Sequence, residues 1–567
     1  MGTRASPAVR LALTLLILVA CLLAAGSWRV YSNTWDEPEH LAAGIELLDR
    51  GLYEYDTEHP PLGRVPLALG PYLAGAHSYG TPPPNGTQEG LDILYSDGHY
   101  WRYLTLARLG TLPFLALLLW ATWLWARRLL PSEGGALLAV LLLVSVPAIL
   151  GHAALASLDV AAAATCLLAL YALQLWLQEG GRRAGLYFGL AAGVAIGTKF
   201  SAVPFLGLAL PALALVKTVL VARWGGGAAA AAPVATPAAS AGRRAQGLAL
   251  AALGALAVLW LAYGPRASNP AGVALRFDWA VSYLLQRPGL DHALGVVLAH
   301  LWLPRELKDL VNGIVAVKAH NDTGHLSYLL GRVSNTGWWY FYLVALAAKT
   351  PIPLLAAGPL GVAWLARDGW RTRNAFQLAP AVLVLVLLLF VSLFSRINIG
   401  IRHVLMLYPF LALGGAYLAQ RAWRALAHLR PPRAALARAA LLLLLAWQIS
   451  PLATAYPDYL PYFNAAVRHP ERVLVDSDLD WGQDLARLEQ RAAALKIRHL
   501  NLAYRGTADL SREPLPPFSN LGPKQPVSGW VAISELARTR NPADYAWLDV
   551  FTPVERVGSS IDLYYVP

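Results

Sequence analysis

A short acidic segment, TWDEPEH at residues 34–40, follows the first long apolar run of the chain. It places the carboxylates of Asp36, Glu37 and Glu39 beside the imidazole of His40. Acidic residues in the first turn of a helix favour its dipole, so the segment is consistent with helix capping. A carboxylate at the membrane surface can equally take a proton from a substrate hydroxyl as a general base. The spacing leaves both interpretations of Asp36 open.

A further carboxylate, Asp159, is expected at the start of the fourth membrane span, just before four alanines. An ionisable residue on an apolar helix is costly unless the protein uses it, although aspartate is also a good N-cap. We favour a functional role, because Asp159 is predicted to emerge on the same face of the membrane as Asp36.

Cationic residues and histidines with apolar neighbours form the other half of the predicted site. A phosphate-bearing lipid needs such groups, and arginine binds phosphate through paired hydrogen bonds. Each of them alone is equally consistent with a long side chain anchored at the interface. Their convergence on the acidic face favours substrate binding. The expected substrate-binding residues, one acid included, are Glu58, His59, Arg64, Lys199, Lys349, Arg396, Arg402 and His403.

The composition identifies the class of protein. Hydrophobic residues make up 56% of the 567 positions and charged residues 14%, and the mean hydropathy is +0.45. Soluble domains carry about a quarter charged residues, so a polytopic α-helical membrane protein is expected. The excess of 46 Lys and Arg over 34 acidic residues is assigned to membrane loops rather than to nucleic-acid binding. The sequence has no P-loop, no GxGxxG before a helix, no HExxH and no GxSxG, which excludes a soluble nucleotide-sugar platform.

About eleven apolar runs are long enough to cross the hydrocarbon core. They centre near residues 18, 115, 143, 169, 191, 211, 255, 350, 387, 411 and 446. The first run resembles a signal peptide, but its length and the many later spans predict an uncleaved helix. Arginine-rich connections after alternate helices place the N-terminus on the cytoplasmic side of a bacterial inner (plasma) membrane.

The same orientation places the long loops and the tail outside the cell membrane. Residues 1–456 are expected to form the transmembrane domain, with external loops at 29–100 and 265–337 and a flexible cytoplasmic linker at 225–242. Residues 38–51 predict an amphipathic helix along the interface. Residues 457–567 alternate β-rich runs (RVLVDSD, RHLNLAY, GWVAIS, IDLYYVP) with a helical stretch at 484–496, which predicts a small extracytoplasmic α/β domain. Polar sequence concentrated outside favours surface chemistry over transport.

Several motifs together resemble the protein O-mannosyltransferase and aminoarabinose transferase group. They are WDE at 35–37, HPPL at 59–62, Asp159 and GTKFSA at 197–202. Bacterial members of glycosyltransferase family thirty-nine are also similar in IGIRHVLMLYPFLAL at 399–413 and SDLDWGQDL at 477–485. The resemblance implies a GT-C fold, a polyprenyl-phosphate-linked sugar as donor and inversion at the anomeric carbon. It also implies that Asp36 is the general base, that Glu37 orients the site and that Asp159 is the second acid.

The function expected from this resemblance is transfer of a hexosyl or pentosyl group to an acceptor hydroxyl on the extracytoplasmic face. The acceptor is a lipid, a protein or a glycan, and membrane lipids are the other partners. The base is expected to have a raised pKa, and cations are expected to bind the departing phosphate. A transporter or flippase of a lipid-linked saccharide is the alternative. No cofactor is firmly implied; a divalent cation between Asp36 and Asp159 stays open, whereas residues 476–487 depart from a calcium loop at its sixth and twelfth positions.

Overall fold

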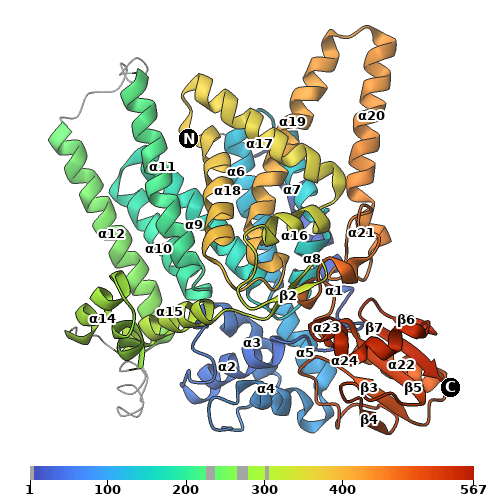
Figure 1. The fold of residues 1–567 in the computed structure, drawn as a ribbon. Coiled ribbons are helices and arrows are strands. Elements are labelled where there is room, and N and C mark those ends of the chain that lie inside the picture. The colour runs from blue at the N-terminus through green and yellow to red at the C-terminus, as the bar shows by residue number, and fades with distance from the viewer. Residues whose placement is uncertain (1–4, 225–236, 265–278, 301–304) are drawn as a thin grey trace.

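The computed structural model describes residues 5–224, 237–264, 279–300 and 305–567. In these ranges eight helices are long and apolar enough to cross a membrane, or nine if a bent pair is one span. Most run side by side as a bundle (Figure 1), so the protein is a multi-pass membrane protein. The helices concerned are α1 (Pro7–Ala25), α5 and α6 (Tyr100–Leu109, Leu112–Leu129), α9 (Asp159–Glu179), α11 (Ala202–Trp224), α12 (Pro237–Tyr263), α18 (Ala375–Phe394), α19 (Tyr408–Ala425) and α20 (Pro431–Ile449), with α7 and α8 (Glu133–Val144, Pro147–Ala153) as the bent pair.

The predicted count of eleven spans is not confirmed. Near residue 191, α10 (Arg182–Thr198) has only 17 residues and packs against α9 and α12. Near residue 350, the chain breaks between α16 (Phe341–Lys349) and α17 (Ile352–Thr372). Pro351 lies at this break, and proline removes a backbone donor and disfavours a helical conformation in the residue before it. Of the predicted linker at 225–242, residues 225–236 lie outside the described residues, and α12 begins at Pro237.

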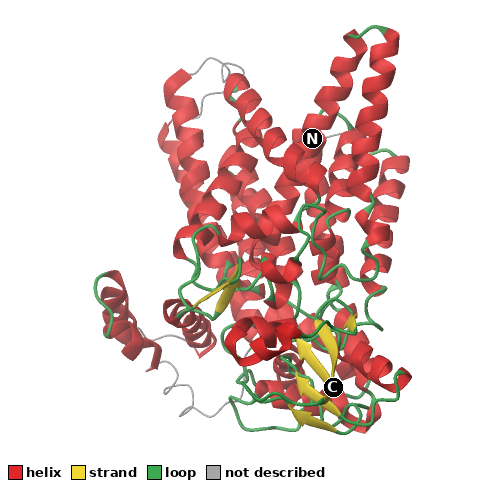
Figure 2. Ribbon diagram, turned by 45° about the vertical axis from the view of Figure 1, so that its right-hand side comes forward, coloured by secondary structure: helices red, strands yellow, loops and turns green. Residues whose placement is uncertain are grey.

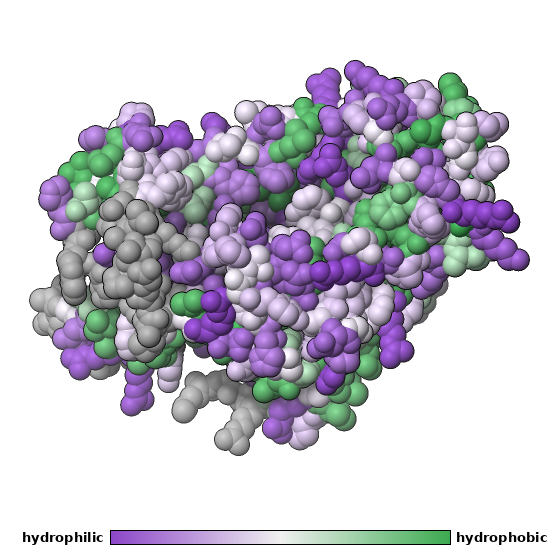
Figure 3. Space-filling view, turned by 90° about the horizontal axis from the view of Figure 1, so that it is seen from below, coloured by the Kyte–Doolittle hydropathy of each residue, from purple (hydrophilic) through white to green (hydrophobic). Residues whose placement is uncertain are grey.

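The segments predicted to be external gather at the lower end of the bundle in Figure 1. They include α2 (Glu37–Arg50), α3 (Arg64–Leu73), α4 (Gly86–Tyr95), α14 (Leu290–His300), α15 (Arg305–Thr323) and the hairpin of β1 (Ser327–Leu329) and β2 (Arg332–Ser334). Seen from below, this end is largely hydrophilic (Figure 3). The predicted helix at residues 38–51 is present as α2, which is buried against α3 and α4, and its position along the membrane interface stays a prediction.

The tail forms the predicted α/β unit (Figure 2). Its sheet has the order β4-β3-β5-β7-β6, in which β3 is parallel to β4 and β5 while β7 is antiparallel to β5 and β6. The strands are β3 (Leu500–Ala503), β4 (Phe518–Asn520), β5 (Gly529–Ser534), β6 (Glu555–Val557) and β7 (Ile561–Val566), with helices α22 (Leu485–Ala494), α23 (Glu535–Arg540) and α24 (Pro542–Tyr545). The predicted strand RVLVDSD is wrong, because residues 476–478 form a 3-10 turn that contacts the membrane part.

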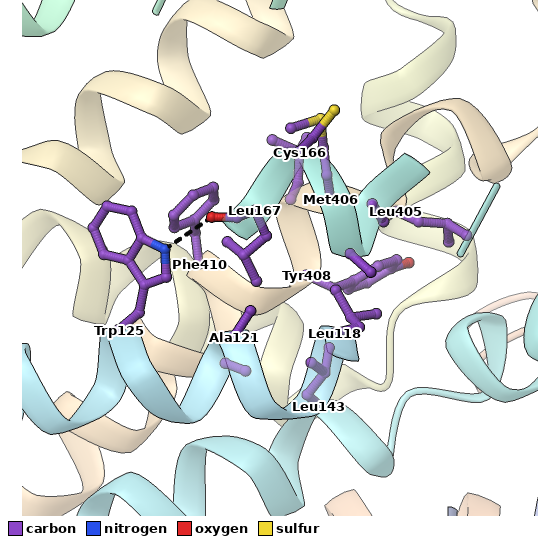
Figure 4. Packing of buried hydrophobic residues seen from close by; sticks show 14 of the residues in the cluster. Leu118, Ala121, Trp125, Leu143, Cys166, Leu167, Leu405, Met406, Tyr408 and Phe410 are labelled. Atoms are coloured by element: carbon purple, nitrogen blue, oxygen red, sulfur yellow. Dashed lines mark hydrogen bonds between the residues drawn. The ribbon is translucent and has the colours of Figure 1, made fainter. Parts of the chain in front are cut away.

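The apolar core fixes the helices that carry the polar residues. In Figure 4, Leu118, Ala121 and Trp125 of α6 pack beside Leu167 of α9 and Phe410 of α19. The Trp125 indole donates a hydrogen bond to the Leu167 carbonyl at 3.3 Å. This packing holds the start of α9, where Asp159 lies, next to residues 401–407, a 3-10 segment that leads into α19.

Candidate active site

A cavity of about 980 Å³ lies where the segments predicted to be external meet the helix bundle. Its lining combines charged residues with apolar residues such as Ala163, Phe205 and Phe390 of α9, α11 and α18. The structure brings most of the predicted site residues together there. Those that line the cavity are Asp36, Glu58, His59, Asp159, Lys199, Arg396, Arg402 and His403.

Two carboxylates and two cations form a continuous charged cluster in the cavity. The Arg402 Nη1 atom lies 2.5 Å from Oδ2 of Asp36 and 3.7 Å from Oδ2 of Asp159. Lys199 donates to Oδ1 of Asp159 at 2.6 Å. Asp159 Oδ2 and Arg402 Nε are buried without a hydrogen-bond partner among the described residues. The cluster therefore balances its charges and still has unused hydrogen-bonding capacity.

Asp36 is held as an anion by this arrangement. Burial alone would raise the pKa of its carboxyl group, but the nearby positive charge of Arg402 keeps that pKa below its usual value. The prediction of a raised pKa for the base is therefore wrong for Asp36 in this state. The residue follows the 28–34 loop and precedes the first turn of α2, where its side chain makes no capping hydrogen bond.

Glu37 is a structural clamp rather than a cavity residue. Its carboxylate is 1% exposed and accepts two hydrogen bonds from Arg108, both at 2.8 Å. It also accepts from the Thr34 amide at 2.8 Å and from the Ala156 amide at 2.7 Å. These bonds join the start of α2 to α5 and to the loop before Asp159, so Glu37 fixes the backbone on both sides of the acidic cluster.

Arg64 and Lys349 lie outside the cavity lining, contrary to their predicted role in substrate binding. Arg64 is fully buried, pairs with Asp56 and donates to the Tyr53 hydroxyl at 2.9 Å. Lys349 is 1% exposed and donates to the carbonyls of Leu460 and Asp478 at 2.8 and 2.6 Å. Both donate their hydrogen bonds to groups inside the protein, because a buried charge is stable only when it is paired.

The mouth of the cavity carries acids and imidazoles. His59 contacts the Asp56 carboxylate at 3.0 Å, and His320 contacts the Glu58 carboxylate at 2.9 Å. Burial, with the negative charge of Asp56 as the next contribution, raises the pKa of Glu39 to about 7. Arg396 is exposed and donates to the Asp322 carbonyl at 3.2 Å.

Several cavity residues were not predicted from the sequence. They are Glu39, His320, His325, Asp476, Trp481 and Arg540. Asp476 and Trp481 lie in or beside SDLDWGQDL, whose dense acids around a tryptophan were the one sequence signal available. His320, His325 and Arg540 stand in no such motif.

The region between Asp36 and Asp159 is already occupied by a cation of the protein. The Arg402 guanidinium lies there, within reach of both carboxylates. Among the described residues, no group of three or more His, Cys, Asp and Glu side chains is placed to hold a metal ion. The donor set at this position therefore does not fit the divalent cation that the sequence left open.

Fold and cavity thus define a multi-pass membrane protein with a charged site at one end of its bundle, beside an apolar wall. Residues 12–228 match the model of the dolichyl-phosphate-mannose-protein mannosyltransferase family. The match contains Asp36, Asp159 and Lys199, and it confirms the resemblance to GT-C membrane glycosyltransferases. No curated protein sequence matches the chain.

Solved structures also show a likeness over much of the chain. ArnT from Cupriavidus metallidurans bound to undecaprenyl phosphate has 14% identity and a TM-score of 0.45, with 97% of each chain covered. The apo state of that protein has 15% identity and a TM-score of 0.46 over the same shares. The archaeal oligosaccharyltransferase AglB from Archaeoglobus fulgidus, in complex with an inhibitory peptide and a dolichol-phosphate, has 14% identity and a TM-score of 0.44, covering 80% of this chain and 56% of its own.

Proposed function

We propose that this protein is an inverting membrane glycosyltransferase that moves a sugar from a polyprenyl-phosphate donor to an acceptor hydroxyl. The observation that carries the proposal is the cluster of Asp36, Arg402, Asp159 and Lys199 in one cavity that also has an apolar side. A site for a lipid-linked sugar phosphate needs charged groups for the phosphate and apolar surface for the lipid. The match of residues 12–228 to a mannosyltransferase family supports the same reaction class.

The donor is proposed to bind with its lipid along the apolar wall of α9, α11 and α18. Its phosphate then lies near Lys199 and Arg402, whose positive charges stabilise the polyprenyl phosphate as it leaves. Phe205, Phe390 and Phe394 are cavity residues that suit contact with isoprene units. Arg396, which is exposed at the mouth, is proposed to attract the anionic headgroup rather than to hold it.

Asp36 is proposed as the general base. The acceptor oxygen attacks the anomeric carbon, the bond from that carbon to the phosphate oxygen breaks, and the hydroxyl proton moves to the Asp36 carboxylate. Attack from the side opposite the phosphate inverts the anomeric centre. The lowered pKa of Asp36 rises when a bound phosphate shares the Arg402 charge, so the donor itself activates the base.

We further propose that the reaction takes place on the extracytoplasmic face of a bacterial inner membrane, with the N-terminus in the cytoplasm. Residues 1–456 are the transferase domain and residues 457–567 the external domain in this proposal. The positive-inside rule supports this orientation, because the arginine-rich connections lie at the end of the bundle opposite to the cavity.

The test compares Asp36→Asn with the wild-type protein in detergent. Transfer of radiolabelled sugar from polyprenyl-phosphate donors is measured, and a loss of at least about a hundredfold is expected, since a general base contributes about 10²–10⁴ to the rate. Asp97→Asn is the matched control, because Asp97 is exposed in the same external segment at a φ of 51° that asparagine accepts well. Absence of transfer from every donor by the wild-type protein would favour a flippase, since detergent has no second compartment.

A further inference from the structure

The segment of residues 476–484 in the tail is bonded to the loop that carries Asp36. The Ser32 amide donates to the Gln483 carbonyl at 2.9 Å, and the Trp35 amide donates to the Trp481 carbonyl at 3.1 Å. These bonds reach both sides of residue 34, so the tail fixes the backbone that leads into Asp36. A contact of this kind is unexpected for an independent appended domain.

The same segment is bonded to the loop that carries Arg402. The Ile401 amide donates to Oδ1 of Asp478 at 3.2 Å, and the Ser477 hydroxyl donates to the Ile399 carbonyl at 2.5 Å. Lys349 adds a third tie through the Asp478 carbonyl at 2.6 Å. The tail segment is thus the common partner of two loops that are far apart in sequence and that meet in the cavity.

Trp481 connects this segment directly to the charged cluster. Its side chain is only 2% exposed, and the Arg402 Cζ atom lies 4.4 Å from the ring centroid. The ring of His152 packs against the indole with centroids 6.0 Å apart. An arginine stacked on an indole keeps its hydrogen-bonding edge free, so the guanidinium can contact Asp36 and still offer a donor to a phosphate.

The tail also supplies part of the cavity wall. Asp476, Trp481 and Arg540 line the cavity together with the membrane residues. Arg540 lies 3.5 Å from the Asp476 carboxylate, and its Nε atom is buried without a hydrogen-bond partner among the described residues. The cavity is therefore incomplete without the tail.

We infer that the C-terminal domain completes the active site, and that Trp481 is a positioning residue that holds the Arg402 guanidinium for the donor phosphate. This inference rests on the proposed function and adds a role for the tail. The segment of residues 476–484 fixes the Asp36 loop relative to the Arg402 loop, and the indole sets the plane of the guanidinium. Loss of the ring lets Arg402 turn away from the phosphate while its charge remains.

The experiment compares Trp481→Phe with Trp481→Leu in the full-length protein. Both substitutions leave an apolar side chain that is smaller than tryptophan, but only phenylalanine keeps a ring face for the cation. Undecaprenyl phosphate is the probe, and its dissociation constant is measured in detergent together with kcat and KM for sugar transfer. Trp530→Leu is the matched control, because Trp530 lies in the same domain on β5 and does not line the cavity.

We expect Trp481→Leu to weaken undecaprenyl phosphate binding by about tenfold or more, and Trp481→Phe to stay within about threefold of the wild type. The KM for the donor should follow the same order. Trp530→Leu should leave the dissociation constant unchanged. Equal binding by the Phe and Leu variants, both folded by thermal unfolding, overturns the inference. A wild-type protein that binds undecaprenyl phosphate yet never transfers sugar overturns the proposed function instead.

Discussion

The Arg402 guanidinium and the Asp36 carboxylate lie 2.5 Å apart, although 366 positions separate them in the chain. The pair joins the segment before α2 to the segment that precedes α19. It keeps the carboxylate of the proposed base ionised and balances its negative charge. In the proposed function, the donor phosphate shares this guanidinium with Asp36. Donor binding and activation of the base are therefore coupled through one side chain.

Substitution of Arg402 tests this coupling. Arg402→Lys should raise the donor KM by about tenfold, because an ammonium group cannot bind a carboxylate and a phosphate with the fixed geometry of a guanidinium. Arg402→Ala should lower kcat/KM by about a hundredfold or more, since it removes the cation paired with Asp36 and leaves Asp159 with Lys199 alone. Arg332→Ala is the control, because Arg332 is exposed on β2. A donor KM for Arg402→Ala equal to that of the wild type would exclude a role in phosphate binding.

Glu37 and Arg108 provide a test of structural support. Glu37→Gln removes the charge from a carboxylate that accepts two bonds from a fully buried guanidinium, and breaking such a pair costs about 3–5 kcal/mol. We expect a clear drop in the thermal unfolding temperature in detergent. Glu58→Gln should change that temperature little, because the Glu58–His320 pair is more than one-third exposed and such pairs contribute about 0–1 kcal/mol. Similar drops for the two variants would show that Glu37 is not a clamp.

The charged cluster could be predicted in part from the sequence because membrane topology limits where polar residues can meet. Arginine-rich connections placed Asp36 and Asp159 on one face, and the structure joins them through Arg402. The sequence does not indicate which group each cationic side chain pairs with. Arg64 and Lys349 carry the charge expected of a phosphate site, but their partners are an internal carboxylate and two backbone carbonyls.

The secondary structure of the tail could also be predicted only in part from the sequence. The strands at 500–503, 529–534 and 561–566 follow from β-rich runs, whose pattern is local. Residues 472–478 also begin with a β-rich run, yet residues 476–478 turn because Ser477 and Asp478 bond to residues 399 and 401. Such contacts between distant segments leave no periodic signal in the chain.

Glu39 predicts a specific pH dependence of stability. Burial raises the pKa of this carboxyl group from 4.5 to about 7, so its ionisation opposes folding. The stability that the neutral form provides is fully present below about pH 4.5 and is lost as the pH rises through about 7. Relative to wild type, Glu39→Gln should therefore gain stability across this window, by at most about 3 kcal/mol. Thermal unfolding of both proteins between pH 4 and 8 measures the difference, and a constant difference over that range would contradict the shift.

Gly400 tests the junction between the tail and the Arg402 loop. Its φ is +146°, and a Cβ atom there would lie 2.1 Å from the Ser477 hydroxyl oxygen. Gly400→Ala should separate residues 399–401 from the tail segment, which lowers both the thermal unfolding temperature and the affinity for undecaprenyl phosphate. Gly51→Ala is the matched control, since Gly51 also has a positive φ, +64°, but has no atom within 4 Å of the added Cβ position. It should cost only the backbone strain of about 1–2 kcal/mol and leave lipid binding unchanged.

A second substitution separates the clash from the strain. In the Gly400→Ala background, Ser477→Ala removes the clashing oxygen and leaves the Ser477 Cβ position at 3.4 Å, an ordinary contact. The double variant should therefore recover most of the lost affinity, although Ser477→Ala alone removes the hydrogen bond to the Ile399 carbonyl. Such recovery means that the effects of the two substitutions are not additive, and a double-mutant cycle measures this interaction between the two residues. If the effects of the two substitutions on lipid affinity are additive, the contact between Gly400 and Ser477 does not orient Arg402.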